Sequence, residues 1–164
     1  MRRSWEGTAW SVARTARIGS GAWGAAPGEH VPPVDREIEG ARVVVVDDSE
    51  DNLDWMSLAL HEAGAQVRGA ASAREAWEMV AAGDVDVVVS DLSMPDKAGY
   101  WLVRMMRAST KLKRVPALAV SAYSTSQVAG AASAAGFDAF LQKPLDPTTL
   151  VTTVRALLHQ AGVR

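Results

Sequence analysis

The feature that most constrains the fold is a five-fold alternation of strand-like apolar runs with helix-like segments, beginning near residue 42. Runs such as Val43–Val46 are short, continuously apolar and β-branched, which is typical of a strand buried on both faces. A stretch with the apolar spacing of a helix follows each run. This alternation predicts βαβ units, and therefore an α/β domain with a five-stranded, parallel, doubly wound sheet.

The elements can be placed from periodicity and from helix start and stop signals. Strands are expected at about residues 42–46, 66–69, 86–90, 116–120 and 137–141. The first helix is expected at about 51–63, and Ser72 with Glu75 forms a capping box that opens the second. The fourth helix, near residues 124–132, is rich in small residues and has low helix propensity. Asp146 followed by Pro147 predicts the start of the last helix.

The first 40 residues differ from the rest, because they are rich in Gly, Ala, Ser, Trp and Pro without a sustained apolar period. We expect residues 1–40 to be a disordered or poorly ordered tail and residues 41–162 to be the folded domain. A chain of 164 residues has no room for a second domain of ordinary size. A net charge of -2, the absence of Cys and the lack of a membrane-length apolar stretch favour a cytoplasmic protein that binds neither nucleic acid nor membrane directly.

Polar side chains stand where the apolar runs end. Asp47 and Asp48 follow the first run, Asp91 the third, Ser121 the fourth and Lys143 the fifth. Side chains at the carboxyl ends of parallel strands converge in one crevice. The sequence therefore predicts a pocket with three carboxylates, one hydroxyl and one ammonium.

This set of groups suits phosphoryl chemistry. Neighbouring carboxylates in a buried crevice repel each other unless a cation compensates, and Mg²⁺ prefers such oxygen ligands. A carboxylate can attack phosphorus to give an aspartyl phosphate, and a metal ion and an ammonium are the expected assistants. Lys143 is the candidate ammonium, and Ser121 offers a hydroxyl to a phosphoryl oxygen.

Four motifs together resemble the receiver domains of two-component response regulators, the CheY-like branch of the flavodoxin-like folds. They are Val-Val-Val-Val-Asp-Asp at residues 43–48, Ser-Asp-Leu-Ser-Met-Pro at 90–95, Ser-Ala-Tyr at 121–123 and Leu-Gln-Lys-Pro at 141–144. The resemblance covers about residues 41–160. It implies that Asp91 is the phosphoacceptor, that Asp48 binds Mg²⁺ directly and Asp47 largely through water, and that the Ser93 carbonyl is a further ligand.

The same resemblance assigns the remaining groups of the site. Ser121 and the Ala122 amide would bind the phosphoryl group, Lys143 would neutralise it, and Phe140 stands at the position of the switch aromatic. The donor would be a phosphohistidine on a sensor histidine kinase or a histidine phosphotransfer protein. No output domain is expected in this chain, so a separate and unknown protein would be the downstream target. A receiver assists its own phosphorylation and dephosphorylation but is not a turnover enzyme.

Other readings remain open at the level of sequence. The chain could be a pseudo-receiver that binds partners without phosphorylation, or the detached receiver of a hybrid histidine kinase. A phosphohydrolase of the dehalogenase type also uses an Asp at a strand end, but it needs an Asp-x-Asp arrangement, whereas Asp47 and Asp48 are adjacent. A nucleotide-binding protein is disfavoured, because no Gly-rich phosphate loop follows the first strand.

Overall fold

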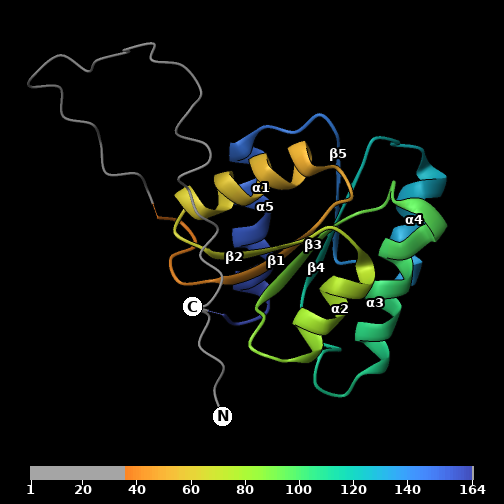
Figure 1. Cartoon of the computed structure of the whole chain (residues 1–164), viewed down its shortest axis with the longest axis horizontal. Coiled ribbons are helices and arrows are strands. Elements are labelled where there is room, and N and C mark those ends of the chain that lie inside the picture. Colours follow the sequence, from red (N-terminus) through yellow and green to blue (C-terminus); the bar gives the residue numbers. More distant parts are fainter. Residues whose placement is uncertain (1–35, 164) are drawn as a thin grey trace, which may run out of the picture. The chain divides into compact units, whose positions relative to one another are not determined.

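The computed structural model describes residues 36–163, which form one parallel sheet flanked by helices (Figure 1). The strands are β1 (Arg42–Val46), β2 (Gln66–Ala70), β3 (Val87–Asp91), β4 (Ala117–Ser121) and β5 (Ala139–Gln142). The helices are α1 (Glu50–Glu62), α2 (Ala73–Ala81), the short 3₁₀ helix η3 (Pro95–Lys97), α3 (Ala98–Ala108), α4 (Ser126–Ala135) and α5 (Pro147–Gln160). The predicted five-stranded, parallel, doubly wound α/β fold is confirmed.

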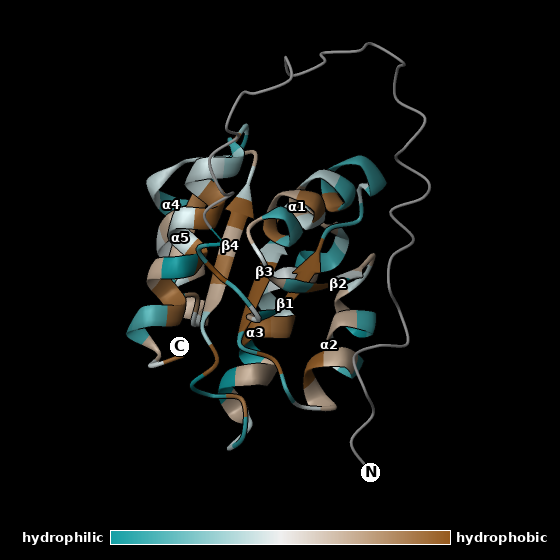
Figure 2. Ribbon diagram, turned by 90° about the vertical axis from the view of Figure 1, so that its left-hand side faces the viewer, coloured by the Kyte–Doolittle hydropathy of each residue, from teal (hydrophilic) through white to brown (hydrophobic). Residues whose placement is uncertain are grey.

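The strand order is β2-β1-β3-β4-β5, so the direction of winding reverses at β1. Helices α1 and α5 contribute to the apolar core on one face of the sheet, and α3 and α4 contribute to the core on the other. The central strands β1, β3 and β4, between these layers, are strongly hydrophobic (Figure 2). Ligands of open parallel sheets bind at the carboxyl ends of the strands where the order reverses, which here means the ends of β1 and β3.

Ordered packing begins upstream of the boundary expected at residue 41. Ile38 is buried in the core beside α1 and α5. Its backbone N–H donates to the Ala63 carbonyl, and the Gly40 N–H donates to the Gly64 carbonyl. Residues 36–40 therefore belong to the domain. The expectation of a disordered tail otherwise concerns residues 1–35, which lie outside the described residues. Within residues 36–163, no helix is both long and apolar enough to cross a bilayer.

Arg107, near the end of α3, holds together three segments at the edge of the sheet opposite the carboxyl ends of the strands. Its Nε donates to the Gly136 carbonyl at 2.9 Å, and its Nη1 donates to the Val115 carbonyl at 2.8 Å. Its Nη2 donates to the Asp138 carboxylate at 2.8 Å, and that carboxylate also accepts the Ala117 N–H. One guanidinium thus fixes the C-terminal end of α4 and the segments that enter β4 and β5.

Asp146 caps α5, as the sequence predicted. Its carboxylate accepts the Thr149 backbone N–H at 2.8 Å and the Thr149 hydroxyl at 2.7 Å, and these bonds hold the pKa of Asp146 below its ordinary value. Because the pKa of Asp146 is lower in the folded state than in the unfolded chain, ionised Asp146 stabilises the fold at pH values above its pKa in the unfolded chain. This stabilisation is lost as pH falls through its pKa in the folded state.

We expect the stability advantage of the wild type over Asp146→Asn to shrink as pH falls. Asn caps a helix about as well as Asp but does not titrate. Thermal melts of both proteins between neutral pH and about pH 3, which brackets the ordinary aspartate pKa, would measure the difference. If the difference in melting temperature between the two proteins did not change with pH, the lowered pKa of Asp146 would be contradicted.

The turn before α3 contains two consecutive residues other than glycine with left-handed backbone, Asp96 (φ 59°) and Lys97 (φ 54°). A side chain in this region clashes with the following carbonyl, at a cost of about 1–2 kcal/mol per residue. We expect Lys97→Gly to stabilise the protein by about 1 kcal/mol in denaturant unfolding, since glycine relieves the clash but adds unfolded-state entropy. Lys97→Ala keeps the clash and is the control, so an equal gain in both variants would exclude backbone strain as the cause.

Candidate functional site

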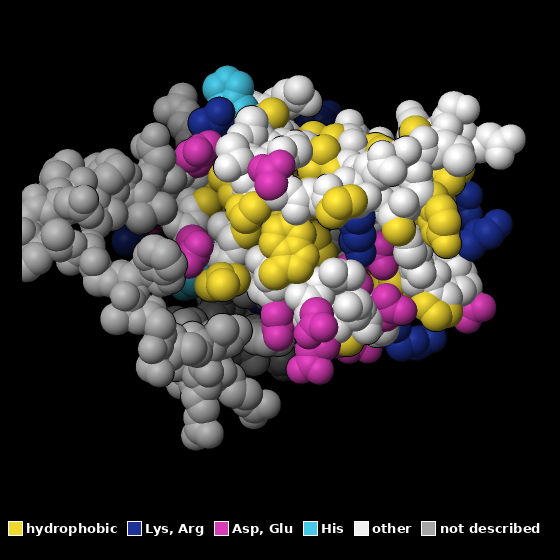
Figure 3. All heavy atoms as spheres, turned by 90° about the horizontal axis from the view of Figure 1, so that it is seen from above, with side chains coloured by type: hydrophobic (Ala, Val, Ile, Leu, Met, Phe, Trp, Pro, Cys, Tyr) yellow, Lys and Arg dark blue, Asp and Glu magenta, His cyan; other side chains and the backbone are white. Residues whose placement is uncertain are grey.

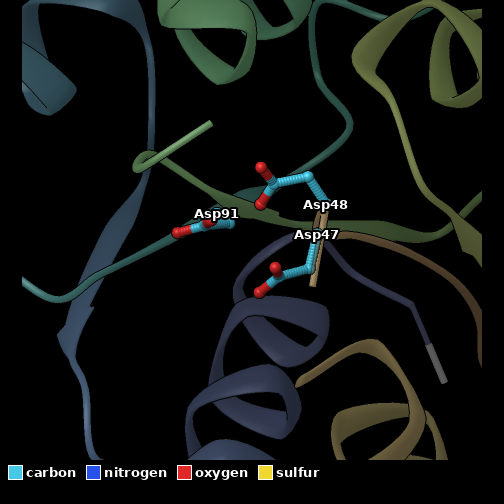
Figure 4. A group of neighbouring side chains, drawn as sticks. All are labelled: Asp47, Asp48 and Asp91. Carbon is cyan, nitrogen blue, oxygen red and sulfur yellow. The ribbon is translucent and has the colours of Figure 1, made fainter. Parts of the chain in front are cut away.

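Three carboxylates meet at the carboxyl ends of β1 and β3, where the sequence predicted a pocket. Asp47 and Asp48 follow β1, and Asp91 is the last residue of β3. Each can offer one oxygen such that all three oxygens lie within 4.8 Å of one another, and Figure 4 shows the three carboxyl groups gathered there. Asp47 and Asp91 are buried, whereas Asp48 is exposed.

Lys143 brings a positive charge to this cluster from the end of β5. Its Nζ lies 2.9 Å from Asp47 Oδ2 and 3.4 Å from Asp91 Oδ1. Its backbone N–H donates to the Ser121 carbonyl at 2.7 Å, which joins the ends of β4 and β5. The lysine is therefore held beside both buried acids. One ammonium against three carboxylates still leaves an excess of negative charge.

The buried acids are oriented by main-chain N–H groups. Ser93 N–H donates to Asp91 Oδ1 at 3.0 Å, and Ser49 N–H donates to Asp47 Oδ1 at 2.9 Å. Burial raises the pKa of Asp91, and the Asp47 charge adds to this increase, while the Ser93 N–H and Lys143 oppose it. The net effect is a raised pKa, so ionised Asp91 gains from any further cation.

Ser121, at the end of β4, is buried, and its hydroxyl oxygen accepts the Tyr123 N–H at 3.1 Å. Because the hydroxyl hydrogen is not used in that bond, Ser121 can still donate to a ligand. Ala122 is exposed at the start of the next loop. Phe140 is partly buried on β5, against the core that α3 and α4 share. Asp91, Ser121 and Lys143 therefore lie at or just beyond the carboxyl ends of their strands. Phe140 lies further back on β5, where it pairs with Ala119 in the middle of β4.

Two residues that position Asp91 were not assigned this role from the sequence. The buried Ser90 hydroxyl donates to the Asp91 carbonyl at 3.2 Å. A Cβ on Gly99, in the first turn of α3, would lie 2.5 Å from the same carbonyl oxygen, which is too close for any side chain. A glycine early in a helix and shortly after the acceptor loop is the one sequence signal of this contact. Because Gly99 has no side chain, α3 can pack directly on the end of β3.

The donor set fits a hard divalent cation. Carboxylate oxygens from three residues are the ligand type that Mg²⁺ prefers. The cluster contains no histidine, and the chain contains no cysteine, so ligands typical of zinc sites are missing from it. The excess negative charge beside Lys143 also favours a bound cation.

Comparisons with known proteins agree with this geometry. The chain matches the response regulator receiver domain family over residues 43–155. It is 34% identical over 113 residues to an uncharacterized 14.6 kDa protein of Leptolyngbya boryana, covering 69% of this chain and 86% of that protein. It is 38% identical over 120 residues to the DNA-binding transcriptional regulator NtrC of Rhizobium meliloti, covering 72% of this chain and 24% of NtrC. For several such regulators, the chain spans a quarter to a half of their length.

Solved structures show the same relationship. The chemotaxis response regulator CheY4 of Vibrio cholerae has a TM-score of 0.69 at 31% identity, with 72% of this chain and 98% of that chain covered. A putative response regulator of Chloroflexus aurantiacus has a TM-score of 0.70 at 30% identity, with 74% and 99% covered. The family match covers most of the chain, and it coincides with the part that carries the acidic cluster and Lys143. The chain therefore belongs to the response regulator receiver domain family of two-component signalling.

Proposed function

We propose that this domain takes part in a phosphorelay by accepting a phosphoryl group on Asp91. The observation that carries the proposal is the position of Lys143 Nζ, within 2.9 Å of Asp47 and 3.4 Å of Asp91, at a cluster of three carboxylates. A negatively charged nucleophile attacks a negatively charged phosphoryl group only where positive charge is already arranged.

In this reaction an Asp91 carboxylate oxygen forms a bond to phosphorus while the bond from phosphorus to the donor histidine nitrogen breaks. The Ser93 N–H holds Asp91 Oδ1, so the carboxylate is oriented and its other oxygen is the attacking atom. Lys143 neutralises charge on the phosphoryl oxygens. The Ser121 hydroxyl and the Ala122 N–H donate hydrogen bonds to them.

Mg²⁺ is the proposed cofactor, held by Asp47, Asp48, Asp91 and the Ser93 carbonyl. When bound, it supplies positive charge to the phosphoryl oxygens. Asp47 and Asp91 would be shared by both cations, because both already contact Lys143, and Asp47 accepts a hydrogen bond from it. The second oxygen of Asp47 accepts the Ser49 N–H, which keeps the carboxylate aimed at the cluster.

Two kinds of protein partner follow from this proposal. The phosphoryl donor is a phosphohistidine of a sensor histidine kinase or a histidine phosphotransfer protein. Hydrophobic side chains gather in the middle of the face seen from above, with Asp and Glu side chains on several sides of them (Figure 3). Such a face suits contact with another protein. The second partner is the downstream target, which responds when Ser121 and Phe140 transmit phosphorylation to the surface of α4, β5 and α5.

Intact-mass measurement after incubation with acetyl phosphate and Mg²⁺ tests the proposal. We expect a phosphate-sized gain that requires Mg²⁺ and that hydroxylamine removes, since hydroxylamine cleaves acyl phosphates. A folded protein that gains no mass from acetyl phosphate or from a phosphorylated histidine phosphotransfer protein would be a pseudo-receiver. Repeated turnover of a generic phosphate ester would instead indicate a phosphohydrolase.

A further inference from the structure

Helices α2 and α3 present two tryptophans on the outside of the domain. The rings of Trp77 and Trp101 meet edge to face, with centroids 6.4 Å apart and an angle of 69° between their planes. Trp101 is 41% exposed, and Met105, one turn further along α3, is 36% exposed. We call Trp77, Trp101 and Met105 the α2–α3 patch. It lies on helices outside the phosphorylation site and is independent of it.

Trp101 and Met105, the exposed members of this patch, are not part of the hydrophobic core. The apolar side of α3 that faces the sheet carries Leu102, Val103 and Met106, all of them buried. Trp101 and Met105 lie beside this stripe and remain open. Large apolar groups that stay exposed together are typical of protein contact sites, where Trp and Met are enriched.

The charged residues that lie three and four positions from the two tryptophans on their own helices have one sign. On a helix, the neighbours of a side chain on the same face are three and four positions away. For Trp77 and Trp101 these positions carry Arg74 and Arg104, while the others within the two helices are apolar and none is acidic. Lys97, the residue before the first residue of α3, is a third cation at the start of that helix. The three cations are exposed, and none forms an ion pair with another residue of the described range.

The positive charge of Arg74, Lys97 and Arg104 contrasts with the slightly negative charge of the whole chain. The whole sequence has a net charge of -2, so the positive charge around the patch is local. Glu78 is the nearest acid in sequence to Trp77, but one position along a helix places it about 100° around the axis. The patch thus offers an aromatic centre beside cations that have no ion-pair partner among residues 36–163.

We propose that the α2–α3 patch binds an acidic segment of another protein that also presents large apolar side chains. The apolar side chains would cover Trp101 and Met105, and the carboxylates would pair with Arg74, Lys97 and Arg104. Charge complementarity selects this occupant, because a basic or uncharged segment would leave the three cations without partners. Burial of Trp101 supplies most of the affinity, and the cations supply the selectivity.

The test uses the full chain and two dye-labelled helical peptides, one built from Glu and Leu and one identical except for Lys in place of each Glu. Fluorescence anisotropy should show binding of the acidic peptide with little binding of the basic peptide. Replacing Trp101 and Met105 together by Ala should weaken binding by about tenfold or more. Arg104→Glu should weaken binding of the acidic peptide and strengthen binding of the basic one. Leu58→Ala, which removes an equally exposed side chain from α1, is the matched control and should have no effect.

Several results would overturn the proposal. Equal affinity for both peptides, or an acidic peptide that binds the Ala variant as tightly as the wild type, would exclude the patch as a selective acidic-segment site. Sedimentation that shows a dimer of this chain, dissociated by the same Ala substitutions, would identify a second copy as the occupant. Binding of a single-stranded oligonucleotide that Arg104→Glu abolishes, with no binding of the acidic peptide, would identify a nucleic-acid surface.

Discussion

Replacing Asp91 by Asn is expected to abolish the phosphoryl gain from acetyl phosphate completely, because the amide has no nucleophilic carboxylate oxygen. Asp47 should not substitute for it, since its two oxygens are engaged by Lys143 and by the Ser49 N–H. Asp48 is exposed, and no buried ammonium is paired with it among the described residues. Intact mass measures the loss, and Asp51→Asn on the exposed first turn of α1 is the matched control that should retain the full gain.

The same substitution is expected to stabilise the metal-free protein at neutral pH. Burial raises the pKa of Asp91, so the folded state binds this proton more tightly than the unfolded chain does. As far as Asp91 determines it, the free energy of unfolding is greatest below the ordinary aspartate pKa of about 3.9. It falls as pH rises through the raised pKa that Asp91 has in the folded state. Asn cannot ionise, and its advantage should therefore fade in acid and shrink when Mg²⁺ is added to both proteins.

Phosphoryl gain that persists in Asp91→Asn would move the acceptor to another carboxylate. An Asn variant that unfolds more easily than the wild type at neutral pH, without metal, would show that the Asp91 charge is already fully compensated by Lys143. The two measurements are independent, because one follows covalent chemistry and the other follows the free energy of unfolding.

Arg107→Ala is expected to lower the free energy of unfolding by about 2–4 kcal/mol, since a hydrogen bond to a charged group contributes about 1.5–3 kcal/mol and several are lost together. Four main-chain carbonyls and the Asp138 carboxylate would lose their shared donor. Urea unfolding followed by circular dichroism measures the change.

Arg107→Lys should recover less than half of this loss, because a lysine ammonium has three donors and lacks the planar fork of the guanidinium. Arg104→Ala, one turn earlier on the exposed side of α3, is the control and should change stability by less than about 0.5 kcal/mol. Full recovery by Lys would mean that charge near Asp138, rather than the set of bonds to carbonyls, is what stabilises this end of the domain.

The fold and the acidic cluster could be predicted because both follow from local patterns. Continuous valine runs identify buried strands, and in a parallel sheet every strand end lies at one edge, so Asp91 and Lys143 had to converge. The contacts of Arg107 could not be predicted, because its main partners are carbonyl groups 5 to 29 residues away, and carbonyls carry no side-chain signal. The contact of Gly99 with the strand end and the edge-to-face pairing of the tryptophans likewise depend on how helices pack after the chain has folded.

The attachment of α4 has a mechanical consequence. Its two buried residues, Ala132 and Ala135, both lie in its C-terminal half, and Gly136 just beyond them is the residue that Arg107 holds. The N-terminal end follows an exposed loop that begins directly after Ser121. A ten-residue helix is about 15 Å long, so a rigid tilt of about 10° around the fixed end would displace the free end by about 3 Å. The helix is thus held at the end far from the phosphorylation site, and its other end, next to the loop after Ser121, is the one that a shift of that loop would displace most.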